Sequence, residues 1–171
     1  MRRSLFVGLL SLLAAVMGVA VAQQPVTIDA IKALADKGDK KTALELLDKR
    51  VAADANDVQA RFMKGLLLQE MGNRNEAREV FAEIARLFPK IPEAYNNLAA
   101  LYAQQGEYEQ ARRALLSAVA NAPDYPTVHV NLGDLYIKMA VDAYRDALAL
   151  NPGDADAKAK LRFLEKLLGG G

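Results

Sequence analysis

Two patterns of hydrophobic residues divide this chain. Residues Leu5–Val21 form an apolar run that only Ser11 interrupts with a polar side chain. From about residue 24 onward, apolar residues recur instead at intervals of three and four, which places them along one side of an α-helix. The pattern therefore predicts an apolar N-terminal segment followed by an all-α chain.

The N-terminal segment is typical of a secretory signal peptide. Arg2 and Arg3 precede the apolar run, and Ala20-Val21-Ala22 supplies the small residues that a signal peptidase reads. We expect a cleavable signal peptide over residues 1–22. The alternative is an uncleaved anchor helix, although the run is short for a membrane span of ~20 residues. Export of a chain without cysteine favours the bacterial periplasm or the exterior, reached by the general secretion route.

A repeat of about 34 residues organises the rest of the chain, and its best copy is Pro92–Tyr125. Its marked positions are Tyr95, Leu98, Ala99, Tyr102, Gly106, Ala111, Leu115, Ala118 and Pro123. This series resembles the tetratricopeptide repeat (TPR), in which large, small and aromatic residues mark a first helix, glycine marks a turn, and proline follows a second helix. The resemblance implies stacked helical hairpins, because neither helix of a pair can bury its apolar face alone.

Other copies follow at the same spacing. The copy at 58–91 carries Gly65, Leu68, Gly72, Ala77, Phe81 and Pro89, with Arg61 in place of the aromatic residue. The copy at 24–57 is weak, with Gly38 at its turn, and the copy at 126–153 is atypical because about five residues are missing between its halves. We therefore expect a short right-handed α-solenoid over residues 23–153.

The atypical copy contains no glycine, proline or asparagine where its first helix should turn into the second. Its apolar residues keep an unbroken spacing of three and four, which predicts one helix from about Thr127 to Leu150, ended by Asn151-Pro152-Gly153. The alternative is a tight hairpin turning near Lys138–Met139. Residues 154–168 are expected to form a capping helix, and 169–171 a flexible tail.

Composition argues against catalysis. The 171 residues include no Cys, no Trp and one His, with 22 Lys and Arg against 21 Asp and Glu. Thiolate catalysis and cysteine zinc sites are excluded, and His129 alone offers little for a triad or a metal site. We predict no enzyme activity, no cofactor, no metal and no nucleic-acid partner, and we expect His129 to pack at the place of a large ring.

In the family that the chain resembles, ligands lie on the concave face along the first helices. Transfer by repeat position selects nine partner-binding residues: Phe62, Leu66, Gln69, Asn96, Ala100, Ala103, Val130, Asp134 and Ile137. This set is mixed and leans apolar, and it has no Lys/Arg cluster for an acidic C-terminus. An amphipathic helix or an extended apolar segment therefore suits it better. For Phe62 and Leu66, packing in the core remains an equal alternative.

The sequence thus favours a non-enzymatic scaffold or adaptor that binds another protein or peptide segment of the bacterial cell envelope, without membrane contact after signal cleavage. Only the binding architecture follows from the residues, since a fold alone does not name a process. The alternative is a self-assembling structural protein, a homodimer that pairs through the long helix 127–150.

Overall fold

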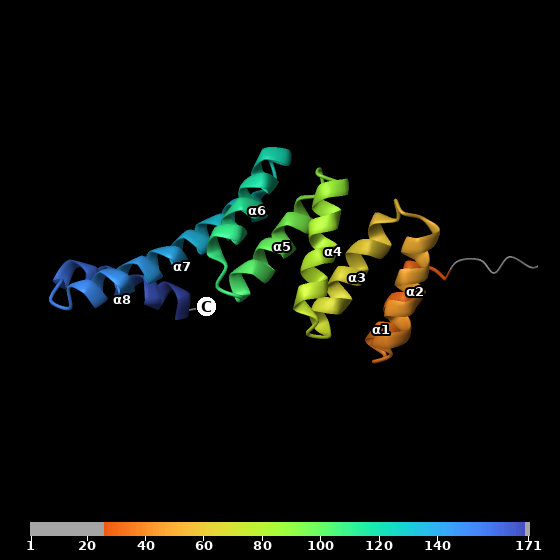
Figure 1. Cartoon of the computed structure of the whole chain (residues 1–171), viewed down its shortest axis with the longest axis horizontal. Coiled ribbons are helices and arrows are strands. Elements are labelled where there is room, and N and C mark those ends of the chain that lie inside the picture. Colours follow the sequence, from red (N-terminus) through yellow and green to blue (C-terminus); the bar gives the residue numbers. More distant parts are fainter. Residues whose placement is uncertain (1–25, 170–171) are drawn as a thin grey trace, which may run out of the picture.

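The computed structural model describes residues 26–169 as a series of eight helices. They are α1 (Ile28–Asp36), α2 (Lys40–Ala53), α3 (Val58–Glu70), α4 (Arg74–Leu87), α5 (Pro92–Gln104), α6 (Tyr108–Asn121), α7 (Pro126–Leu150) and α8 (Ala155–Gly169). Figure 1 shows them side by side in chain order, and each packs against the next. The predicted all-α solenoid is confirmed.

Three glycines reverse the chain inside the first three hairpins. Gly38, Gly72 and Gly106 have φ angles of +95°, +83° and +76°, a left-handed region that side chains with a Cβ disfavour. After Gly72, the amide of Asn73 donates to the carbonyl of Leu68 at 2.9 Å, and the other two turns repeat this bond. Each turn therefore satisfies carbonyls at the end of one helix while it starts the next.

The closest approach between paired helices lies at Gly65. A Cβ atom at this residue would lie 2.8 Å from Cζ of Phe81, whose side chain is fully buried. The ring of Phe81 also meets Phe62 edge to face, with centroids 5.5 Å apart. Glycine therefore allows α3 to approach α4, and buried Ala99 occupies the equivalent place in α5.

In the second, third and fourth repeats, the fourth residue joins its helix to the end of the preceding hairpin. The hydroxyl of buried Tyr95 donates to the carbonyl of Ala85 at 3.0 Å. At the equivalent places, Arg61 and His129 also meet a carbonyl oxygen of the preceding repeat, each at 3.0 Å. His129 is exposed, so it does not fill the place of a buried ring as expected, because among the described residues its own repeat has no second helix beside it.

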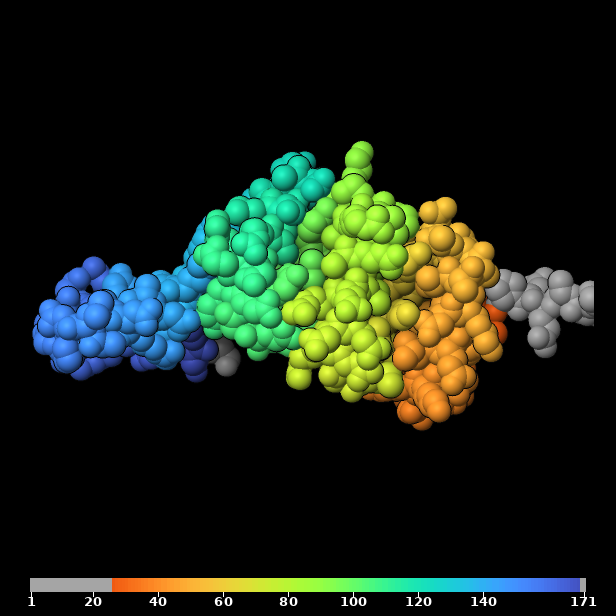
Figure 2. Space-filling view, in the orientation of Figure 1, coloured from red at the N-terminus to blue at the C-terminus, as the bar shows by residue number. Residues whose placement is uncertain are grey.

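The fourth repeat does not form a hairpin. After Tyr125 the chain continues as one helix of 25 residues, α7, without a reversal at Lys138–Met139. It ends at Leu150, with Asn151 as its C-cap, and α8 folds back on its second half, where Nη2 of Arg145 lies 2.8 Å from Oε1 of Glu165. Figure 2 shows α8 and the second half of α7 as a narrow projection from the broader body.

Some sequence predictions fall outside the described residues. The signal peptide, 1–22, and the last two tail residues, 170–171, lie beyond them, whereas Gly169 still ends α8. Within residues 26–169, no helix has both the length and the apolar character that a membrane crossing requires.

Candidate protein-binding groove

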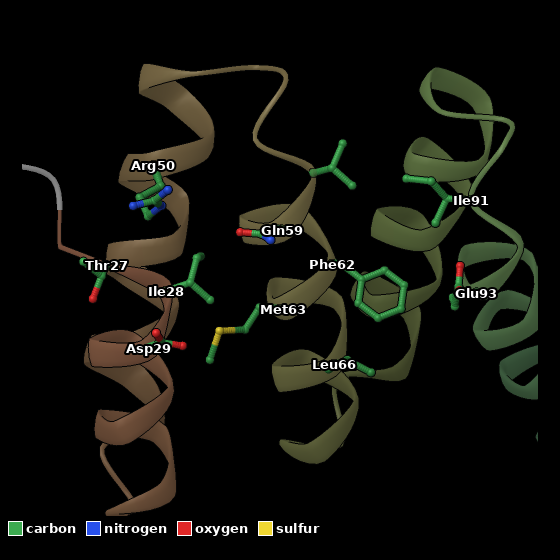
Figure 3. Close-up of a pocket in the computed structure, with 11 residues that line it drawn as sticks. Thr27, Ile28, Asp29, Arg50, Gln59, Phe62, Met63, Leu66, Ile91 and Glu93 are labelled. Carbon is green, nitrogen blue, oxygen red and sulfur yellow. The ribbon is translucent and has the colours of Figure 1, made fainter.

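A cleft of about 730 Å³ opens along the first helices of the hairpins. Its lining residues are Thr27, Ile28, Asp29, Arg50, Val58, Gln59, Phe62, Met63, Leu66, Ile91 and Glu93. Figure 3 shows Met63 directed from α3 toward α1 and Phe62 directed toward α5. The middle helix thus supplies apolar side chains to both sides of the cleft, which can accept apolar groups of a ligand.

The charges that remain available at this cleft are acidic. Asp29 lies on the α1 side and Glu93 on the α5 side (Figure 3). Arg50 is the basic residue of the lining, but it donates to Oδ2 of Asp57 at 2.6 and 2.9 Å and to the carbonyl of Val26 at 2.8 Å. Among the described residues, no three His, Asp or Glu side chains are grouped to hold a metal ion.

Asp57 fixes the wall of the cleft at the start of α3. While Oδ2 binds Arg50, Oδ1 accepts a hydrogen bond from the amide of Ala60 at 2.9 Å, so Asp57 caps the helix. Burial alone raises the pKa of Asp57, but the Ala60 amide and the Arg50 guanidinium outweigh burial and lower the pKa below its ordinary value. The ionised carboxylate therefore joins the end of α2 to α3.

A second, smaller cleft of about 180 Å³ lies between α5, α6 and α7. Its lining residues are Asn96, Ala99, Ala100, Ala103, Ala111, Leu115, Asn131, Asp134, Leu135 and Lys138. The side chain of Asn131 donates to that of Asn96 across it. Because its volume is about 180 Å³ against about 730 Å³, this cleft offers less room for a ligand side chain than the larger one.

The structure divides the nine predicted residues among three places. Phe62 and Leu66 line the larger cleft. The smaller cleft takes Asn96, Ala100, Ala103 and Asp134. Gln69, Val130 and Ile137 line neither cleft. Phe62 lines the larger cleft and also packs on Phe81.

Reasoning by repeat position missed several residues of the larger cleft, including Ile28, Met63 and Ile91. Ile28 precedes Phe62 by 34 residues in the sequence, so the same rule would have found it in the weak first copy. Met63 directly follows Phe62, which the repeat position had selected. Ile91 lies just before α5, where no rule based on helix positions applies.

Comparison with known proteins supports the repeat assignment. The sequence pattern of the tetratricopeptide repeat family matches residues 62–126. The crystal structure of MamA is similar at a TM-score of 0.60 and 25% identity, covering 84% of this chain and 87% of MamA. The TPR protein YrrB is similar at a TM-score of 0.53 and 28% identity, covering 60% of this chain and 53% of YrrB.

The fold also matches the Yersinia enterocolitica type III secretion chaperone SycD at a TM-score of 0.58 and 19% identity, covering 65% of this chain and 90% of SycD. The matched segment, the glycine turns and the stacked hairpins therefore all support the assignment of a tetratricopeptide-type repeat. Residues 62–126 match the tetratricopeptide repeat, and the fold of the chain is similar to those of tetratricopeptide repeat proteins.

Proposed function

We propose that this chain is a non-enzymatic scaffold that holds a segment of another protein in the larger cleft. The observation that carries the proposal is a cleft of about 730 Å³ whose lining comes from three repeats, with apolar side chains from the first two. Binding sites for protein segments are commonly grooves of this kind, with apolar anchors at the centre and polar residues at the rim.

The charges of the cleft narrow the class of partner. Asp29 and Glu93 are acidic, and Arg50 is already engaged by Asp57. An acidic C-terminus would meet like charges, whereas an apolar or amphipathic segment flanked by Lys or Arg would be complementary. The structure of YrrB is described as that of a TPR protein with an unusual peptide-binding site, which is consistent with a peptide segment as the ligand.

The cellular place of this scaffold follows from the sequence. The signal peptide predicted over residues 1–22 directs the chain to the bacterial cell envelope, in the periplasm or outside the cell. The partner is then another envelope protein that presents an apolar or amphipathic segment.

Leu66 and Leu116 form a matched pair for testing the proposal. Both leucines are 39% exposed, but Leu66 lines the cleft on α3 and Leu116 lies on α6 outside both clefts. A photo-reactive amino acid placed at Leu66 in living cells should cross-link a discrete partner, and one placed at Leu116 should not. Leu66→Glu should abolish that partner's co-purification, while Leu116→Glu should leave it unchanged.

The fold must survive in both variants, which far-ultraviolet circular dichroism checks. Leu66 is preferred to Phe62 here because Phe62 also supports the core through Phe81. Equal cross-linking at the two sites, or equal recovery of the partner with both glutamate variants, would show that the cleft does not bind it.

A further inference from the structure

The first half of α7 has an open side where the other hairpins are closed. In α3, Gly65 faces the ring of Phe81 on the second helix of its own hairpin. Gly133 holds the equivalent position in α7, and among the described residues no atom lies within 4 Å of where its Cβ would be. The first half of α7 therefore lacks the second helix that this position normally contacts.

The neighbours of Gly133 are exposed in the same way. Tyr136 is 46% exposed, whereas its equivalent in α3, Leu68, is 1% exposed. His129 is exposed, whereas its equivalent in α5, Tyr95, is buried. Residues with the character of a core thus line an open surface, which we call the α7 slot and define as His129, Gly133 and Tyr136. Such a surface indicates a site of association.

The second half of α7 carries the sequence that fits this slot. Alignment on Pro152 places Tyr144 and Ala147 at the repeat positions of Leu115 and Ala118, which α6 buries in its own hairpin. Tyr144 is therefore the counterpart of the large residue that faces the small one. Its ring is half-buried, with Nζ of Lys160 from α8 5.8 Å from the ring centroid.

One chain cannot bring these two surfaces together. Gly133 and Tyr144 lie eleven residues apart on one helix, so about 16 Å of helix axis separates them. A second chain can bring its Tyr144 to Gly133 of the first chain, because its α7 can run antiparallel to the α7 of the first chain. The second helix of a hairpin runs antiparallel to the first helix in the same way.

We propose that two copies of this chain pair their α7 helices antiparallel about a two-fold axis at Lys138–Met139. Tyr144 of each copy then packs on Gly133 of the other, and each second half supplies the helix that the other copy's slot lacks. The axis passes through the point where the turn is missing, midway between the two contact residues. The contact is isologous and closed, in the manner of a domain swap. It goes beyond the scaffold function, because the larger cleft is formed by other helices.

A cysteine pair tests the proposed contact directly. The chain has no cysteine, so Gly133→Cys combined with Tyr144→Cys introduces the only two thiols. Under oxidation this variant should give at least about tenfold more covalent dimer than a control, because a disulfide needs Cα atoms within roughly 7 Å and the two sites cannot meet within one helix. The control combines Gly133→Cys with Ala149→Cys, an exposed site on another side of α7. Equal dimer in the two variants overturns the proposal.

Restoring the turn tests the cause of pairing. A copy of residues Gln105–Glu109 inserted between Lys138 and Met139 supplies the five missing positions, including a glycine. The second half of α7 should then fold onto its own slot. We expect the full chain, purified after expression, to sediment as a dimer and the insertion variant as a monomer of equal helicity.

Either of two sedimentation results overturns the proposal: a monomeric parent chain throughout the micromolar range, or a folded insertion variant that still dimerises. If the insertion variant does not fold, the cysteine pair decides the question alone. Leu66→Glu should leave the dimer intact, which separates failure of this inference from failure of the scaffold function.

Discussion

The contact between Gly65 and Phe81 predicts a measurable coupling between two substitutions. Gly65→Ala adds one methyl group at a point where atoms of the Phe81 ring lie 2.8 and 2.9 Å away. The ring is fully buried and also held by Phe62, so it has no free space to enter. The added methyl group must therefore push α3 and α4 apart or distort the ring.

The size of the effect follows from two opposing terms. Alanine favours a helix over glycine by roughly 1 kcal/mol. Overpacking a core costs about 1–3 kcal/mol. Gly65→Ala should therefore lower the free energy of unfolding by about 0–2 kcal/mol. With Phe81→Leu present, the methyl group has room, as in the third repeat, where Ala99 and Leu115 hold the same positions. In that background Gly65→Ala should stabilise by about 1 kcal/mol.

A double-mutant cycle measures this coupling. The free energy of unfolding is determined by urea denaturation, followed by circular dichroism, for the parent chain, each single variant and the double variant. We expect a coupling of about 1–3 kcal/mol in favour of the double variant. Gly133→Ala is the matched control, because the same substitution at the same repeat position meets no described atom within 4 Å. At protein concentrations too low for association, Gly133→Ala should raise the free energy of unfolding. Effects of Gly65→Ala and Phe81→Leu that add within about 0.5 kcal/mol would refute the close contact.

Three further substitutions test other parts of the structure by urea or thermal unfolding. Gly72→Ala should destabilise by about 1–2 kcal/mol, because φ at this residue is +83°. Tyr95→Phe should cost about 1–3 kcal/mol by leaving the buried carbonyl of Ala85 without its hydrogen bond. Asp57→Asn should destabilise at neutral pH, since the lowered pKa of Asp57 means that its charge stabilises the fold above the ordinary aspartate pKa. That contribution is lost as the pH falls through the lowered value, so the difference from the parent chain should vanish in acid. A difference independent of pH would exclude the Arg50 pair as its cause.

The features that could be predicted from sequence are those with a local cause. A position with positive φ in a tight turn favours glycine. Gly72 and Gly106 therefore predicted two reversals of the chain without knowledge of the fold. A close contact between two helices needs a small residue, so Gly65 predicted the pairing of α3 with α4. The absence of any such breaker before Asn151 indicated that α7 continues.

The candidate groove was less predictable, because a cleft depends on how far neighbouring helices stand apart. Phe62 was selected by its repeat position and lines the larger cleft, but its equivalent Val130 lines neither cleft. Val130 is 62% exposed, since among the described residues no further hairpin lies beside α7. Phe62 could not be assigned to core or groove from its position, because its ring is large enough to reach both. Oε1 of Gln69 is buried without a hydrogen-bond partner among the described atoms, which no periodic pattern predicts.

The shortened fourth repeat leaves a side of α7 uncovered that a second helix of the same repeat would otherwise bury. A terminal helix that faces only water should carry polar residues on its outer side, as the caps of helical repeat arrays do. The open side of α7 instead keeps Gly133 and Tyr136, and its second half keeps Tyr144 at the position that would face Gly133. Residues suited to a helix pair are thus present in both halves, while the turn that would join them is absent. Removal of a turn from an otherwise intact hairpin leaves its pairing energy available between chains, so a partner in the same repeat register is the occupant that best satisfies both halves.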